Sequence, residues 1–137
     1  FTVNALTLPL SDSAVLEEGP DGALYYVIDD TLVRWSIADG SVNVSCANQP
    51  PLSAVRQLVY DAADDTLYLA QAATIYRFAN VSTACSGSLL AGEVGSAGLV
   101  PGPLPARLSR VGGMALTQGR DLLVTQPDEN TILLIRP

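Results

Sequence analysis

Residues 90–136 read LAGEVGSAGLVPGPLPARLSRVGGMALTQGRDLLVTQPDENTILLIR, and this stretch decides the fold. It contains a Gly-punctuated loop, a turn at Gln118-Gly119, the apolar run DLLVTQ, a turn at 127–130 and a second apolar run, TILLIR. Short apolar runs bounded by turn residues are typical of β-strands. The stretch therefore predicts a small antiparallel sheet, and such a sheet cannot bury its own faces without neighbours.

The same pattern occurs twice more towards the N-terminus. The segments TLVRW (31–35), TIYRF (74–78) and TILLI (131–135) align with one another, and each follows another short apolar run and a turn. Strand pairs that recur in the same order with the same kinds of turn form an internal repeat. The period of this repeat suits a propeller blade of four antiparallel strands.

We therefore expect an all-β chain, a single domain over 1–137, with about three β-propeller blades at 11–47, 53–92 and 106–137. Residues 2–8 are expected to form a further strand that completes a blade. No segment sustains helical spacing. Residues 53–60 could form a helical turn, but their alternation also fits a strand, which we prefer because the equivalent segment contains Gly112-Gly113. Strands are expected at 23–29, 31–37, 41–46, 53–60, 66–71, 74–79, 111–118, 121–126 and 131–136, with a weaker segment around 86–92.

The stretch 90–136 resembles an NHL repeat. The features that carry this resemblance are Gly95, Gly98 and Gly102, Ala106-Arg107-Leu108, Val111–Ala115, Gly119, Leu122–Gln126, Asn130 and Ile132–Arg136. Gln71 and Gln126 stand where the family often has Asp, and Val111 replaces the usual proline. The resemblance implies half of a six-bladed propeller. The missing half would be the remaining blades of a longer chain, a protein partner, or a second copy in a homodimer.

The amino-acid composition excludes several classes of partner. The 137 residues carry 14 acids against 7 bases, with no His, and all seven bases are scattered arginines. A nucleic-acid partner needs a clustered basic face, so none is expected. The acidic balance disfavours anionic membrane surfaces, and no apolar run is long enough for a membrane span. The chain begins at Phe1 inside a strand-like pattern, so we expect it to be processed or to be part of something longer.

Cysteines and sequons indicate the compartment. Cys46 and Cys85 permit one disulfide, and they are either paired with each other or independently free. Asn43 and Asn80 each begin a glycosylation sequon close to one of these cysteines. We therefore expect an extracellular or cell-surface glycoprotein. At the level of repeat plus sequons, the chain also resembles the NHL ectodomains of trypanosomatid flagellar-adhesion glycoproteins.

The residue types argue against catalysis. Absence of His removes His-ligated zinc and Ser-His or Cys-His nucleophiles, and absence of Lys removes Schiff-base chemistry. The acidic groups Asp29-Asp30 and Asp61 with Asp64-Asp65 lack the spacing of a Ca²⁺ loop, so we interpret them as turn residues. Glu17-Glu18 is likewise interpreted as a solvated turn. We expect no catalytic or metal-binding residue and no cofactor.

The long loop 93–105 is the expected binding segment, because binding residues gather on loops that a rigid scaffold positions. The residues selected in it are Glu93, Gly95, Gly98 and Gly102. Arg34 and Arg77 hold equivalent places beside aromatic residues and are expected to be structural. The predicted function is a non-catalytic scaffold for protein–protein contact or adhesion. The alternatives are a propeller hydrolase or lactonase that uses a divalent cation, and a cell-envelope scaffold.

Overall fold

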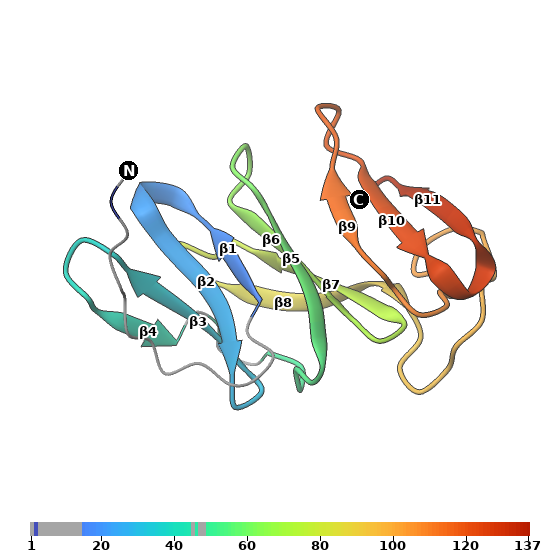
Figure 1. The fold of residues 1–137 in the computed structure, drawn as a ribbon, viewed down its shortest axis with the longest axis horizontal. Coiled ribbons are helices and arrows are strands. Elements are labelled where there is room, and N and C mark those ends of the chain that lie inside the picture. The colour runs from blue at the N-terminus through green and yellow to red at the C-terminus, as the bar shows by residue number, and fades with distance from the viewer. Residues whose placement is uncertain (1, 3–14, 45, 47–48) are drawn as a thin grey trace.

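The computed structural model describes residues 2, 15–44, 46 and 49–137. These residues form three antiparallel sheets and no α-helix, which confirms the all-β expectation (Figure 1). The first sheet contains β1 (Leu16–Glu18), β2 (Ala23–Ile28), β3 (Thr31–Ser36) and β4 (Val42–Val44). The second contains β5 (Val55–Asp61), β6 (Thr66–Gln71), β7 (Thr74–Ala79) and β8 (Ser86–Gly92). The third contains β9 (Met114–Leu116), β10 (Leu122–Gln126) and β11 (Thr131–Ile135).

Each sheet is a meander in which strands consecutive in sequence pair with one another. The two central strands of the second sheet, β6 and β7, have the bounds that their β-branched and aromatic residues predict. Residues 55–61 are the strand β5, so the helical alternative for this segment is wrong. The β2–β3 hairpin turns at Asp29 and Asp30, both with positive φ (47° and 59°), as a tight two-residue hairpin requires.

The first strand of the first sheet was not expected. Glu17 and Glu18 lie in β1, where they pair with Tyr25 and Leu24, and they do not form a solvated turn. Acidic residues are depleted in strands, so the local composition of this segment argues against the strand that the pairing with β2 imposes. The strand expected at 2–8 lies almost entirely outside the described residues.

The second sheet lies between the other two (Figure 1). One of its faces packs Leu58, Leu69 and Phe78 into a cluster with residues of the first sheet. Its opposite face packs Tyr68 and Ile75 against the third sheet. Burial on both faces explains why five successive residues of β6 are buried, whereas β10 alternates between buried and exposed residues. Full burial of one such aliphatic or aromatic side chain stabilises the fold by about 1.5–3 kcal/mol.

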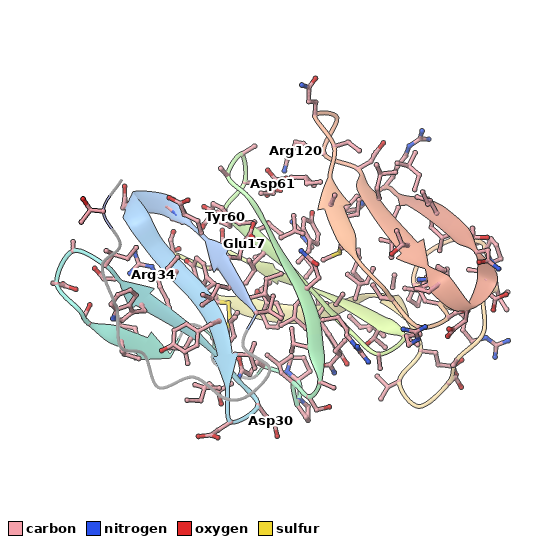
Figure 2. The ribbon with its side chains drawn as sticks, viewed as in Figure 1. Glu17, Asp30, Arg34, Tyr60, Asp61 and Arg120 are labelled. Carbon is pink, nitrogen blue, oxygen red and sulfur yellow. A yellow bond between two sulfur atoms is a disulfide. The ribbon has the colours of Figure 1, made fainter. Side chains whose placement is uncertain are left out.

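The first strands of the three sheets contact one another in the order β1, β5 and β9. Two polar contacts join the sheets along this line (Figure 2). Glu17 Oε1 accepts a hydrogen bond from the backbone N–H of Tyr60 at 2.8 Å. Arg120, in the β9–β10 turn, donates through Nε to Asp61 Oδ2 at 2.8 Å and pairs with Asp64 at 2.5 Å. The described residues include no helix long and apolar enough to span a bilayer.

Candidate functional site

The third sheet has one face that nothing covers among the described residues. Leu32, Ile75 and Ile132 hold equivalent positions. Each is the second residue of the third strand of its meander, namely β3, β7 and β11. Leu32 and Ile75 have exposed fractions of 0% because each packs on the sheet that follows. Ile132 is 67% exposed. The third sheet therefore presents the same kind of face as its predecessors, without a sheet against it.

We call this surface the open face and define it by Leu123, Ile132 and Leu134, all exposed. Leu123 and Leu134 are cross-strand partners. The equivalent pairs in the first and second sheets are Tyr25 with Arg34 and Tyr68 with Arg77. The open face is thus more apolar at these positions than the two faces that are buried. Large contiguous apolar surface on a folded domain marks a contact site.

Among the described residues, the outer edge of the third sheet also has no partner strand. β3 and β7 each have a strand on both sides, whereas β11 pairs only with β10. Beside this edge lies a groove of about 540 Å³, which we call the edge groove. It runs between the loop segment 99–108 and the end of the chain, and the residues lining it are Ala91, Leu99, Pro101–Leu104, Ala106–Leu108 and Leu133–Arg136.

The loop 93–105 is tied back onto the end of β8 and closed by bridges of its own. The backbone N–H of Gly92 donates to the carbonyl of Pro105 at 2.7 Å, and Val100 forms an antiparallel bridge with Arg107. Glu93 bridges to Ser96. Of the selected residues in this loop, Gly95 and Gly98 have positive φ (80° and 117°) at its turns, and only Gly102 lines the edge groove. A second hollow, of about 690 Å³, adjoins Glu93 and shares Gly102.

No protein-family model and no curated protein matches this chain.

The predicted cysteine and sequon residues gather where the first and second sheets end. Cys46 and Cys85 form a disulfide, with their Cα atoms 4.7 Å apart, which links the segment after β4 to the segment before β8. Asn43 is exposed on β4, the outer strand of the first sheet. Asn80 is exposed directly after β7, and the hydroxyl of Ser82 in its sequon donates to Asp65 Oδ2 at 2.6 Å.

The acidic residues weighed as a cation site have other partners. Asp61 and Asp64 bind Arg120, and the carboxylate of Asp61 also accepts the backbone N–H of Ala63. Desolvation opposes ionisation of Asp64, but its hydrogen bonds to Thr66 and Arg120 outweigh that effect and lower its pKa. Asp29 and Asp30 are exposed in their hairpin turn. Within the part of the chain that the structure describes, no three potential ligands converge on a metal position.

Tyr25 and Tyr60 lie at the interface between the first and second sheets. The rings of Tyr25 and Tyr60 stack across the first interface with their centroids 6.1 Å apart. Burial, followed by the hydrogen bond and negative charge of Asp65, raises the pKa of Tyr60 to about 12. Arg34 and Arg77 are half-buried, and Arg77 lies 3.8 Å from Asp64. These residues stabilise the stack of sheets and do not face either groove.

The amino-acid sequence did not lead us to two features of the structure. The pair Arg120–Asp61 joins residues far apart in the chain, and no local pattern signals it. The apolar character of the open face could have been predicted, because aligning TILLI with TIYRF places Leu134 where Arg77 stands. What the alignment lacks is the order in which the sheets stack, and that order decides which faces are covered.

Proposed function

We propose that this chain is a non-catalytic protein-binding scaffold whose three sheets are NHL-like blades of a β-propeller. The blades correspond to 11–47, 53–92 and 106–137, and the open face of the third sheet is the surface on which assembly continues. Further blades, another protein or a second copy of the chain, giving a homodimer, would occupy it.

One observation carries the proposal: Ile132 is exposed at the position where Leu32 and Ile75 are buried between sheets. Stacked repeats bury a continuous core, and a repeat that ends such a stack needs a polar outer face to remain soluble. The third sheet has Leu123, Ile132 and Leu134 there instead. A terminal cap would not be built this way, so the face supports continuation of the stack.

The compartment forms part of the proposal. The disulfide between Cys46 and Cys85 is of a kind that persists in oxidising surroundings. Asn43 and Asn80 are exposed and lie outside the open face. We therefore place the scaffold outside the cell or on its surface, as a glycoprotein that mediates adhesion or other protein contacts.

The assembly is tested by the mass of the protein in solution. Light scattering on the 14.3 kDa chain is expected to give a multiple of that mass, or an assembly with further blades where the chain is part of a longer protein. Ile132→Asp is expected to abolish the larger species, because it places a charge in the interface. Val94→Asp is the matched control, since Val94 is 71% exposed but lies on the loop. A monomeric mass for the wild type, with no longer parent chain, would refute the pairing of two copies through the open face.

Glycosylation is tested separately. Intact mass of the protein secreted from a eukaryotic host is expected to exceed the peptide mass, and to fall stepwise in Asn43→Gln and Asn80→Gln. An unmodified mass in the secreted wild type would contradict the glycoprotein assignment and leave the scaffold intact.

A further inference from the structure

The sequon at Asn80 is held closed by Asp65 in the folded protein. Ser82, the hydroxyl residue of the sequon, donates to Asp65 Oδ2 twice, from Oγ at 2.6 Å and from the backbone N–H at 3.1 Å. The backbone N–H of Val81 donates to the backbone carbonyl of Asp65 at 3.1 Å. Hydrogen bonds to a carboxylate are stronger than those between neutral groups. Asp65 therefore fixes both the backbone and the hydroxyl of this sequon.

The middle residue of the same sequon belongs to the hydrophobic core. Val81 is 3% exposed and packs in the cluster between the first and second sheets. The chain turns at Asn80, which has a φ of 54°, and the N–H of Thr83 donates to the carbonyl of Asn80 at 3.1 Å. The chain then enters the disulfide at Cys85. Extending this segment therefore requires the turn to open and Val81 to leave the core.

The sequon at Asn43 begins in a different environment. Asn43 lies exposed on β4, a strand of three residues at the edge of the first sheet, and the neighbouring Val42 is 53% exposed. Ser45, the third residue of this sequon, lies outside the described residues. Segments with few buried contacts open locally at a lower free energy than core segments. We therefore expect β4 to open at Asn43 more readily than the segment 80–82.

N-glycosylation needs an open sequon. The side-chain amide nitrogen of the asparagine forms a bond to the anomeric carbon of a lipid-linked oligosaccharide. The lipid diphosphate leaves with the bonding electrons, and the amide loses one proton. The hydroxyl of the third residue is part of the recognised motif. At Asn80 this hydroxyl is donated to Asp65, so the transferase has to compete with the fold for it.

We propose that Asn80 is a glycosylation site of the unfolded chain only, and that folding of the second sheet closes it through Asp65 and Val81. The inference rests on the proposed glycoprotein assignment and names what regulates the site. Asn43 stays accessible for longer because it lies on an edge strand. The fraction of chains that carry glycan at Asn80 therefore depends on how fast the second sheet forms.

The test starts from protein made without glycan in bacteria and oxidised to form the disulfide. It is incubated with a purified oligosaccharyltransferase and lipid-linked oligosaccharide, and each site is followed by peptide mass mapping. Modification of Asn80 is expected to be slower by about tenfold or more in the folded chain than in the same chain reduced and alkylated at Cys46 and Cys85. The rate at Asn43 is expected to differ less between the two forms.

Two variants assign the effect to Asp65. Asp65→Gly removes the carboxylate, and glycine suits the positive φ of 53° at this position. This variant is expected to speed modification of Asn80 in the folded chain by about tenfold. Asp64→Ala is the matched control, because Asp64 lies in the same turn but pairs with Arg77 and Arg120. It is expected to leave Asn80 at the wild-type rate.

Hydrogen exchange on the wild type tests the closed sequon without any variant or transferase. The amides of Val81 and Ser82 are expected to exchange slowly, and that of the exposed Ala84 rapidly. Rapid exchange at Val81 and Ser82, equal modification of Asn80 in folded and unfolded chains, or no acceleration in folded Asp65→Gly would overturn the inference. A secreted protein without glycan refutes only the glycoprotein assignment, because the rates with purified transferase depend on the fold alone.

Discussion

Glu17 accepts the backbone N–H of Tyr60, and this hydrogen bond joins the first strands of two neighbouring sheets. Glu17 belongs to β1, a strand that its local sequence disfavours. Tyr60 in turn stacks on Tyr25 and donates its hydroxyl to Asp65 at 3.1 Å. The interface between the first and second sheets therefore combines a polar contact with aromatic packing.

Substitution of Glu17 separates its oxygen acceptor from its charge. Glu17→Ala leaves the N–H of Tyr60 without an acceptor in a half-buried site, and it is expected to lower the free energy of unfolding by about 1–2 kcal/mol. Glu17→Gln retains an acceptor oxygen and is expected to be at least as stable as the wild type at pH 7. Urea unfolding followed by circular dichroism measures both. Equal losses in the two variants would show that the charge, and not the hydrogen bond, matters.

The difference in folding stability between Glu17→Gln and the wild type is expected to change with pH in one direction. Burial raises the pKa of Glu17 above its ordinary value, although the hydrogen bond from Tyr60 opposes this. A raised folded-state pKa gives stability that is complete below the unfolded pKa and is lost as the pH rises through the folded pKa. We expect the stability of Glu17→Gln relative to wild type to increase from about pH 4 upward and then level off. A flat difference would contradict the raised pKa.

We expect burial to determine how much each of the two short ion pairs stabilises the fold. The side chain of Asp61 is 4% exposed where it binds Arg120, whereas Asp128 is 51% exposed where it binds Arg110 at 2.7 Å. Asp61→Ala is expected to cost about 2 kcal/mol because it removes a buried, charge-assisted hydrogen bond between sheets. Asp128→Ala is expected to leave the unfolding midpoint unchanged. Similar effects of the two substitutions would refute the ranking.

The disulfide closes a loop with a sequence separation of 39 residues between Cys46 and Cys85. The loss of unfolded-state entropy for a loop of this length amounts to roughly 4 kcal/mol. The double variant Cys46→Ser/Cys85→Ser is expected to be less stable than the oxidised protein by about that amount. Wild type measured in reductant serves as its control. An unchanged midpoint after reduction would show that the bond does not form in solution.

Three glycines of the loop region form a graded series. An alanine Cβ at Gly92 (φ 93°) would collide with the carbonyl oxygen of Ala73, so Gly92→Ala is expected to cost more than about 2 kcal/mol. Gly95 has positive φ but open space, and Gly95→Ala is expected to cost about 1 kcal/mol. Gly102→Ala meets neither obstacle and is expected to be neutral. Thermal unfolding of the three variants checks the order, and any other order would contradict it.

Local sequence was sufficient where a strand is defined by its own residues and turns. β6 and β7 have the expected bounds, since apolar alternation and tight turns act within a few residues. β1 was missed because Glu17 is stabilised in a strand by Tyr60, which lies far along the chain. The candidate loop was placed correctly as a loop, but of its selected glycines only Gly102 lies in the edge groove.

The amino-acid sequence by itself determined the antiparallel hairpins and their repetition, because both follow from side-chain alternation and turn chemistry over short distances. It could not determine which faces are covered. TIYRF and TILLI have the same pattern, yet Ile75 is buried and Ile132 is exposed. Only the tertiary structure decides this difference, because burial depends on which sheet packs on which. The same stacking brings Arg120 to Asp61 across the interface of the second and third sheets, although the two residues lie far apart in the sequence.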